Sequence, residues 1–178
     1  MTQNELIEDL IERTKYCLNT AEKLQQCDVQ QLNQKQDKKS WSALEAIEHL
    51  NRYGNFYIPE IKKRMDHDTR STLQKFKTGL LGNYFAKSML PREKLNKMKT
   101  FKSMNPLGSD LDRGTLEKFM DQQKQILDLL KTARHKNLTK IKTSISISKW
   151  IHLRLGDTFR VVIYHNQRHI EQAQRAVQ

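Results

Sequence analysis

The chain has 178 residues, which suffice for a single domain with a hydrophobic core. Hydrophobic residues make up 37% of it and charged residues 29%, a globular composition that excludes an intrinsically disordered chain. The formal net charge is +12, and residues 62–102 hold 12 Lys and Arg against 3 Asp and Glu. Most of the positive charge therefore belongs to one segment, and the fold as a whole is not basic.

No run of 18 apolar residues occurs, so the sequence predicts no transmembrane helix. The first residues are polar and acidic, and we expect no signal peptide. Cys17 and Cys27 lie ten residues apart in one helical pattern, where they cannot form a disulfide. These features together predict a cytoplasmic protein with reduced thiols.

The first third of the chain predicts two helices. Residues 4–26 carry apolar side chains at spacings of three and four without Gly or Pro, as an amphipathic helix does. Residues 28–40 are rich in Gln, Asp and Lys and predict a loop. Ser42 and Glu45 then have the spacing of a capping box, which predicts the start of a second helix that runs to about Met65.

Residues 66–110 predict a long, basic connection between the second and third helices. It contains patterns for short helical pieces, which Gly79 and Gly82 weaken. The third helix is expected from Asp112 or Thr115 onward, and it ends near His135.

The last part of the chain predicts an extended segment followed by a fourth helix. Residues 138–154 alternate in part between apolar and polar side chains, which favours extended backbone packed on the helices. Asp157 is the expected N-cap of the fourth helix. Four helices with one long connection predict an all-α four-helix bundle, in a single domain over residues 1–178.

Three histidines form a candidate metal site. His165 and His169 are four residues apart, so on a helix they share one face. His49 lies between apolar residues on the second helix, so it is expected to face the interior. Two imidazoles from one helix and a third from a facing helix can converge on one divalent ion. The alternative is a pair of ordinary surface histidines, since this spacing is also common without a metal. The remaining histidines are expected to be ordinary surface residues: His67, His135 and His152.

Two sequence blocks resemble the DinB-like (DinB/YfiT) superfamily. The first is Trp41-Ser-Ala-Leu-Glu-Ala-Ile-Glu-His49-Leu, which resembles the motif of that family's second helix. The second runs from Leu155-Gly-Asp-Thr-Phe-Arg on to Tyr164-His-Asn-Gln-Arg-His169, which resembles its last-helix motif. The resemblance implies an up-down-down-up four-helix bundle with a long second connection. It also implies that His49, His165 and His169 bind zinc, nickel or another divalent ion.

Three functions remain open at this point. The resemblance implies a metal-dependent thiol transferase, which joins a low-molecular-weight thiol to an electrophile, or a related isomerase. A metal-dependent hydrolase, in which the ion activates water instead, is the other enzymatic reading. Three protein ligands would leave one coordination position open, which is typical of catalytic zinc. In the second alternative the ion is structural and the protein is a non-catalytic stress or interaction module, which predicts a fourth protein ligand and no pocket. The sequence also allows a homodimer without predicting one.

In the third alternative the basic segment binds nucleic acid, although no nucleic-acid-binding motif occurs. Its candidate residues are Lys62, Lys63, Arg64, Lys75, Lys77, Lys94, Lys97 and Lys99. No general base can be named for the enzymatic alternative. Glu45 is expected to act as a cap and Glu48 as a solvated helix residue. Gln172, one turn beyond His169, could orient a ligand, but a surface hydrogen bond is the favoured expectation.

Overall fold

The computed structural model describes residues 1–69, 72–91 and 100–178. This part of the chain is mostly helical, with one small antiparallel sheet, and confirms the expectation of a helical protein. The elements in chain order are α1 (Gln3–Leu24), α2 (Val29–Asn33), α3 (Ala43–Asp66), α4 (Leu80–Met89), the 3-10 turn η1 (Lys102–Met104), α5 (Gly114–Ala133), β1 (Lys142–Ile145), β2 (Ser148–Arg154) and α6 (Leu155–Ala176).

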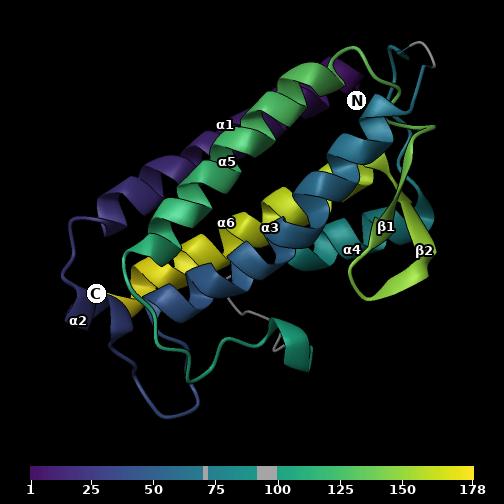
Figure 1. Ribbon diagram of the computed structural model, residues 1–178. Helices are drawn as coiled ribbons and strands as arrows, with labels where there is room; N and C mark the ends of the chain where they lie inside the picture. The colour runs from purple at the N-terminus through teal and green to yellow at the C-terminus, as the bar shows by residue number, and fades with distance from the viewer. Residues whose placement is uncertain (70–71, 92–99) are drawn as a thin grey trace.

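The four long helices pack side by side (Figure 1). Helix α1 packs against α5 and α6, and α3 packs against the same two helices. The helices α1 and α6 run in one direction, and α3 and α5 run in the other (Figure 1). Helices α3 and α6 are neighbours, so residues that face the groove between them can meet across it.

The apolar faces of these helices form two clusters of buried side chains. The larger contains Leu6, Ile61, Ile126 and Phe159, and it also takes in side chains of the β-hairpin. The smaller lies toward the other end of the long helices and includes Phe119. Because both clusters recruit side chains from all four long helices, the helices are fixed relative to one another along their whole length.

The first two long helices begin as the sequence predicts, but the last does not. In α3 the side chain of Ser42 accepts a hydrogen bond from the Glu45 amide, and the Glu45 carboxylate accepts one from the Ser42 amide, so the capping box is confirmed. The expectation that Asp157 caps α6 is wrong. Helix α6 starts at Leu155, directly after β2, and its cap residue Arg154 forms no side-chain cap. The prediction of a loop over residues 28–40 also missed the short helix α2.

Asp157 instead anchors the connection between α3 and α5. Its fully buried carboxylate accepts hydrogen bonds from the Thr78 hydroxyl and, at 2.7 Å, from the Gly79 amide, just before α4. It also forms an ion pair with Arg160, one turn along α6. Gly82 lies so close to Asp157 that a Cβ there would be 2.6 Å from the Asp157 Cβ. The glycine that weakened the prediction of this helix is therefore what allows α4 to pack against α6.

The extended segment of the prediction is a β-hairpin. Strands β1 and β2 pair antiparallel, with a register shift between Ser144 and Ile145. The amide of Ser144 donates a 2.8 Å hydrogen bond to Glu60 of α3, which ties the hairpin to that helix. The hairpin thereby covers one end of the groove between α3 and α6.

Gln3 at the start of α1 links distant parts of the chain. Its side-chain amide donates hydrogen bonds to Thr72 and to the carbonyls of Ala133, Arg134 and Lys136. The side chain is buried, so these acceptors share the two N–H groups that folding removes from water. Among the described residues, no helix combines the length and the apolarity needed to cross a membrane.

Candidate metal centre

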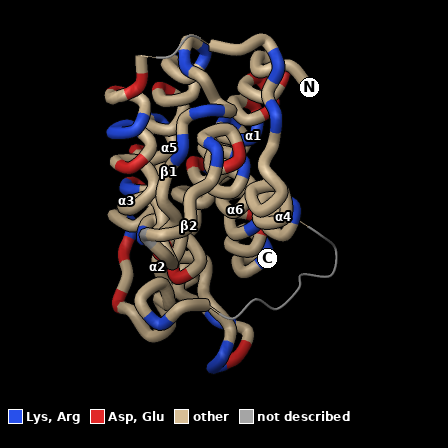
Figure 2. The backbone as a smooth tube through the Cα atoms, turned by 90° about the vertical axis from the view of Figure 1, so that its right-hand side faces the viewer, with Lys and Arg blue, Asp and Glu red and all other residues tan. Residues whose placement is uncertain are grey.

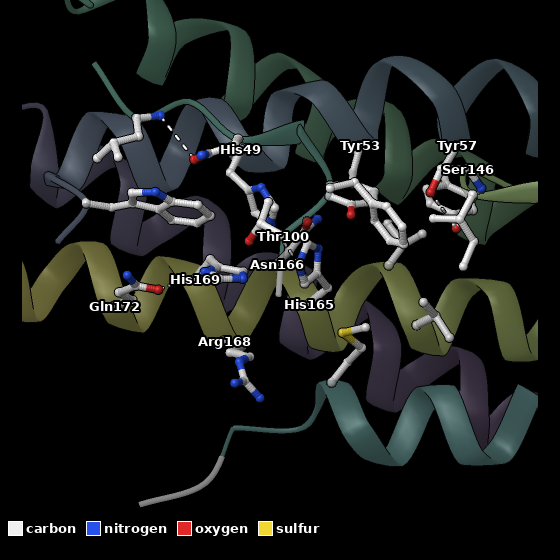
Figure 3. Close-up of a pocket in the computed structure, with 18 of the residues that line it drawn as sticks. His49, Tyr53, Tyr57, Thr100, Ser146, His165, Asn166, Arg168, His169 and Gln172 are labelled. Atoms are coloured by element: carbon white, nitrogen blue, oxygen red, sulfur yellow. Dashed lines mark hydrogen bonds between the residues drawn. The ribbon is translucent and has the colours of Figure 1, made fainter. Parts of the chain in front are cut away.

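The structure brings the three predicted histidines together. His49 projects from α3, while His165 and His169 project from successive turns of α6 (Figure 3). Their candidate ligand atoms all lie within 4.8 Å of one another, and the Nε2 atoms of His49 and His165 are 3.2 Å apart. Within the described part of the chain, no Cys, Asp or Glu side chain joins this group.

Hydrogen bonds orient two of the three imidazoles. The Nδ1 atom of His49 is 2.7 Å from the carbonyl oxygen of Met104, and Nδ1 of His169 is 2.8 Å from Oε1 of Gln172. Both partners are acceptors only, so in the neutral rings Nδ1 carries the proton and Nε2 presents its lone pair. For Gln172, this contact supports the orienting role over the favoured expectation of a surface hydrogen bond.

Burial keeps the three imidazoles neutral. It lowers the pKa of His49 to about 4, with the bond to Met104 opposing the effect and the charge of Arg52 adding to it. It lowers the pKa of His169 to about 3, and the bond to Gln172 opposes this shift. Burial also holds the pKa of His165 well below its ordinary value, and the neighbouring imidazoles lower it further. Neutral imidazole is the form that binds a metal, so no proton needs to be displaced near pH 7.

Aromatic rings surround the group on two sides. The Trp41 ring lies 4.7 Å from the ring of His49 and 5.7 Å from that of His169, centroid to centroid. The Tyr53 ring meets His49 and His165 edge-on at 5.0 and 4.9 Å. Sequence reasoning gave neither residue a role in the site. Tyr53 could have been found from its spacing, since it lies one helical turn after His49.

The donor set fits one divalent ion. Two nitrogens bound about 2.05 Å from a tetrahedral ion lie about 3.3 Å apart, close to the separation observed for His49 and His165. The three histidines are thus compatible with a divalent metal, and all three ligands would come from rigid helices.

The histidines line a cavity of about 880 Å³. Its walls come from α3 and α6, from residues 36–41 before α3, from α4, from residues 100–107 and from the hairpin. The volume lies within the range of roughly 300–1,000 Å³ that small-molecule sites occupy. No Asp or Glu is among the described residues that line it.

The remaining candidate residues lie elsewhere. Glu45 acts as a cap as expected, and it also pairs with Lys35 and accepts a hydrogen bond from the Gly108 amide. Glu48 pairs with Arg52 and does not line the cavity. The expectation of surface positions is confirmed for His67, His135 and His152, which are all exposed.

The described part of the basic segment forms no separate cationic face on α3. Lys62 and Lys63 are exposed, but Arg64 pairs with Glu60. Lys and Arg alternate with Asp and Glu along the outer edge of this helix (Figure 2). Lys75 and Lys77 are also exposed. The other predicted contacts lie outside the described residues: Lys94, Lys97 and Lys99.

A family model for the DinB superfamily matches residues 18–173. The match covers most of the chain, which therefore belongs to the DinB superfamily, as the two motif blocks predicted. No curated protein and no solved structure matches the chain.

Proposed function

We propose that this protein is a metal-dependent enzyme that binds zinc or nickel through His49, His165 and His169. The observation that carries the proposal is the convergence of three neutral imidazoles on a roomy cavity, with no fourth protein ligand in the described group. A structural ion would instead be closed off by a fourth ligand. We further propose that the four long helices form an up-down-down-up bundle. The protein is proposed to be cytoplasmic.

The proposed reaction joins a low-molecular-weight thiol to an electrophilic small molecule, with hydrolysis as the related case in which water replaces the thiol. An ion held by the three imidazoles would supply Lewis acidity, which lowers the pKa of a thiol or a water. The thiol loses its proton to solvent water, its sulfur forms a bond to the electrophilic carbon, and the leaving group departs with the bonding electrons. The absence of a carboxylate from the described cavity walls favours this route over general-base catalysis by Asp or Glu.

Met104 and Gln172 have positioning roles in this proposal. The Met104 carbonyl and the Gln172 side chain fix the protons on Nδ1, so that the Nε2 atoms of His49 and His169 face the ion. The Trp41 and Tyr53 rings flank the imidazoles and give the site partly apolar surroundings. A thiolate in this setting is poorly hydrated and reacts more readily.

Elemental analysis of the purified, untagged protein tests the metal. We expect about one zinc or nickel ion per chain, and its loss in His49→Ala. The matched control is His152→Ala, which removes an exposed histidine and should keep the ion. A His49→Ala protein with full metal content would refute the assignment, and so would native protein that stays metal-free after incubation with both ions.

Once the ion is shown, thiol conjugation measures the reaction. Metal-loaded protein is incubated with a panel of low-molecular-weight thiols and an electrophile such as a haloarene, and product is followed against the chelated protein. Turnover in the loaded protein alone supports the transferase. Turnover of esters or amides without any thiol would favour the hydrolase.

A further inference from the structure

The cavity beside the three histidines is polar at one end and apolar at the other. Along α6, Gln172 and Arg175 follow the histidines, whereas Val161 and Val162 precede them. Helix α3 runs antiparallel to α6, so its residues after His49 lie toward the same end as Val161 and Val162. Tyr57 is one of these, two turns beyond His49. In Figure 3, Gln172 lies on one side of the histidines, and Tyr53, Tyr57 and Ser146 lie on the other.

The polar end carries positive charge at its rim. Lys39 and Arg175 both line the cavity and are both exposed. The nearby carboxylate of Asp37 is turned to the backbone, where it accepts hydrogen bonds from the amides of Lys39 and Ser40. A third cation, the buried Arg168, lines the cavity beside the histidines, and it has contacts of its own, such as the Ser88 carbonyl. With no described Asp or Glu in the walls, the cavity favours an anion.

The apolar end is formed where four elements meet. Its buried wall residues come from α3, the hairpin and α6: Tyr57, Ile145, Leu153, Val161 and Val162. Helix α4 adds Phe85 and Met89. The Tyr57 hydroxyl accepts a hydrogen bond from the Ser146 amide. Its polar atom is therefore already engaged, and Tyr57 contributes mainly its apolar ring to the cavity wall.

We propose that the cavity binds an amphipathic organic anion, with its apolar part between α4, the hairpin and α6 and its anionic group at Lys39 and Arg175. Val161 and Arg175 are separated by about 21 Å along α6 at a rise of about 1.5 Å per residue, and the histidines lie between them. Helical side chains lean toward the N-terminus of their helix, so the long Arg175 side chain shortens the span that a ligand beside the histidines must cover. This inference rests on the proposed function, because both concern the cavity beside the three histidines. It adds the class of ligand that the cavity binds.

Fluorescence of Trp41 can report binding directly. The chain has two tryptophans, and Trp150 is 93% exposed, so Trp150→Phe leaves Trp41 beside the histidines as the single reporter without disturbing the core. Metal-free Trp150→Phe protein is titrated with decanoate and with decylamine, both below their critical micelle concentrations. Removing the metal prevents the carboxylate from binding through the ion alone.

We expect decanoate to saturate the signal and to bind at least tenfold more tightly than decylamine. Shortening the chain to octanoate and hexanoate should weaken binding by up to about fourfold per methylene lost. The double variant Lys39→Glu/Arg175→Glu should remove or reverse the preference for the anion. A matched control, Lys62→Glu/Lys63→Glu, changes the same charge on the exposed face of α3 and should leave the preference intact.

Equal binding of decanoate and decylamine would overturn the proposal, as would the absence of a saturable signal with either. His49→Ala separates this inference from the proposed function. The variant should lose the ion and still bind decanoate. Metal binding without decanoate binding refutes the inference alone, and decanoate binding in a protein that never takes up metal refutes the metal-dependent function alone.

Discussion

The two walls of the cavity differ in origin. One wall consists of α3 and α6, which carry the three histidines on rigid helices joined to both buried clusters. The other consists of segments between the long helices, namely residues 36–41, α4, residues 100–107 and the hairpin. The first wall fixes the geometry that a metal needs, and the second shapes the space around it. In this fold the three histidines therefore all belong to one wall, whereas the other wall supplies much of the surface that meets an organic ligand.

The largest effect is expected from Asp157→Ala, which removes the anchor between the two walls. The substitution leaves Arg160 without its ion pair and the Gly79 amide without its acceptor. Loss of one partner from such a buried pair costs about 3–5 kcal/mol in the free energy of unfolding. Urea denaturation of the metal-free variant measures the loss.

Asp157→Asn is the matched control for this substitution. It keeps an oxygen acceptor for the Gly79 amide and removes the charge, so we expect a smaller loss. If the two walls are separable, Asp157→Ala should also weaken decanoate binding while the folded protein still takes up one ion per chain. A variant as stable as the native protein would show that the anchor is not needed.

Acid should destabilise the helix wall through its neutral histidines. An unfolded His49 titrates near 6.5, whereas its folded pKa is about 4, so between these values the unfolded chain binds a proton that the folded chain does not. Stability is fully present above about pH 6.5 and is lost as the pH falls through this window, by on the order of 3 kcal/mol for His49.

Urea denaturation of metal-free protein at several values between pH 7 and pH 4 follows this loss. His49→Ala should show a shallower dependence on pH over the window, because it lacks one of the groups that titrate. His152→Ala removes an exposed imidazole and should follow the native curve. Identical slopes in the native protein and His49→Ala would contradict the pKa shift.

The smallest of these effects concerns one ligand within the helix wall. In Gln172→Ala, Nδ1 of His169 loses its acceptor and the ring loses its fixed orientation. Loss of such a supporting bond weakens metal affinity by about 10- to 100-fold. Competition against a chelating dye measures the affinity, with Gln174→Ala on the same helix as the control. Equal affinities in the two variants would mean that Gln172 does not position His169.

The sequence predicted the helix wall well because its signals are local. The spacing of His165 and His169 is a property of one helix, and the capping box fixes the start of α3 within four residues. The arrangement of the helices is then enough to predict that His49 faces His165 and His169. The clustering of the three histidines could therefore be predicted from the amino-acid sequence alone.

The other wall depends on contacts between residues far apart in sequence. Asp157 looks like an ordinary N-cap, yet its partners Thr78 and Gly79 lie almost 80 residues earlier. Gly82 resembles a helix breaker until its close approach to Asp157 is seen. The roles of Trp41 and Met104 are likewise set by tertiary packing, which no local pattern encodes.

The contacts of Gln3 have a consequence for the order of folding. Its side chain joins the start of α1 to carbonyls about 130 residues later in the chain. Closing a loop of that length carries a large entropic cost, and contacts of high sequence separation slow folding. The start of α1 therefore reaches its final contacts only once α5 and the residues that follow it are also in place.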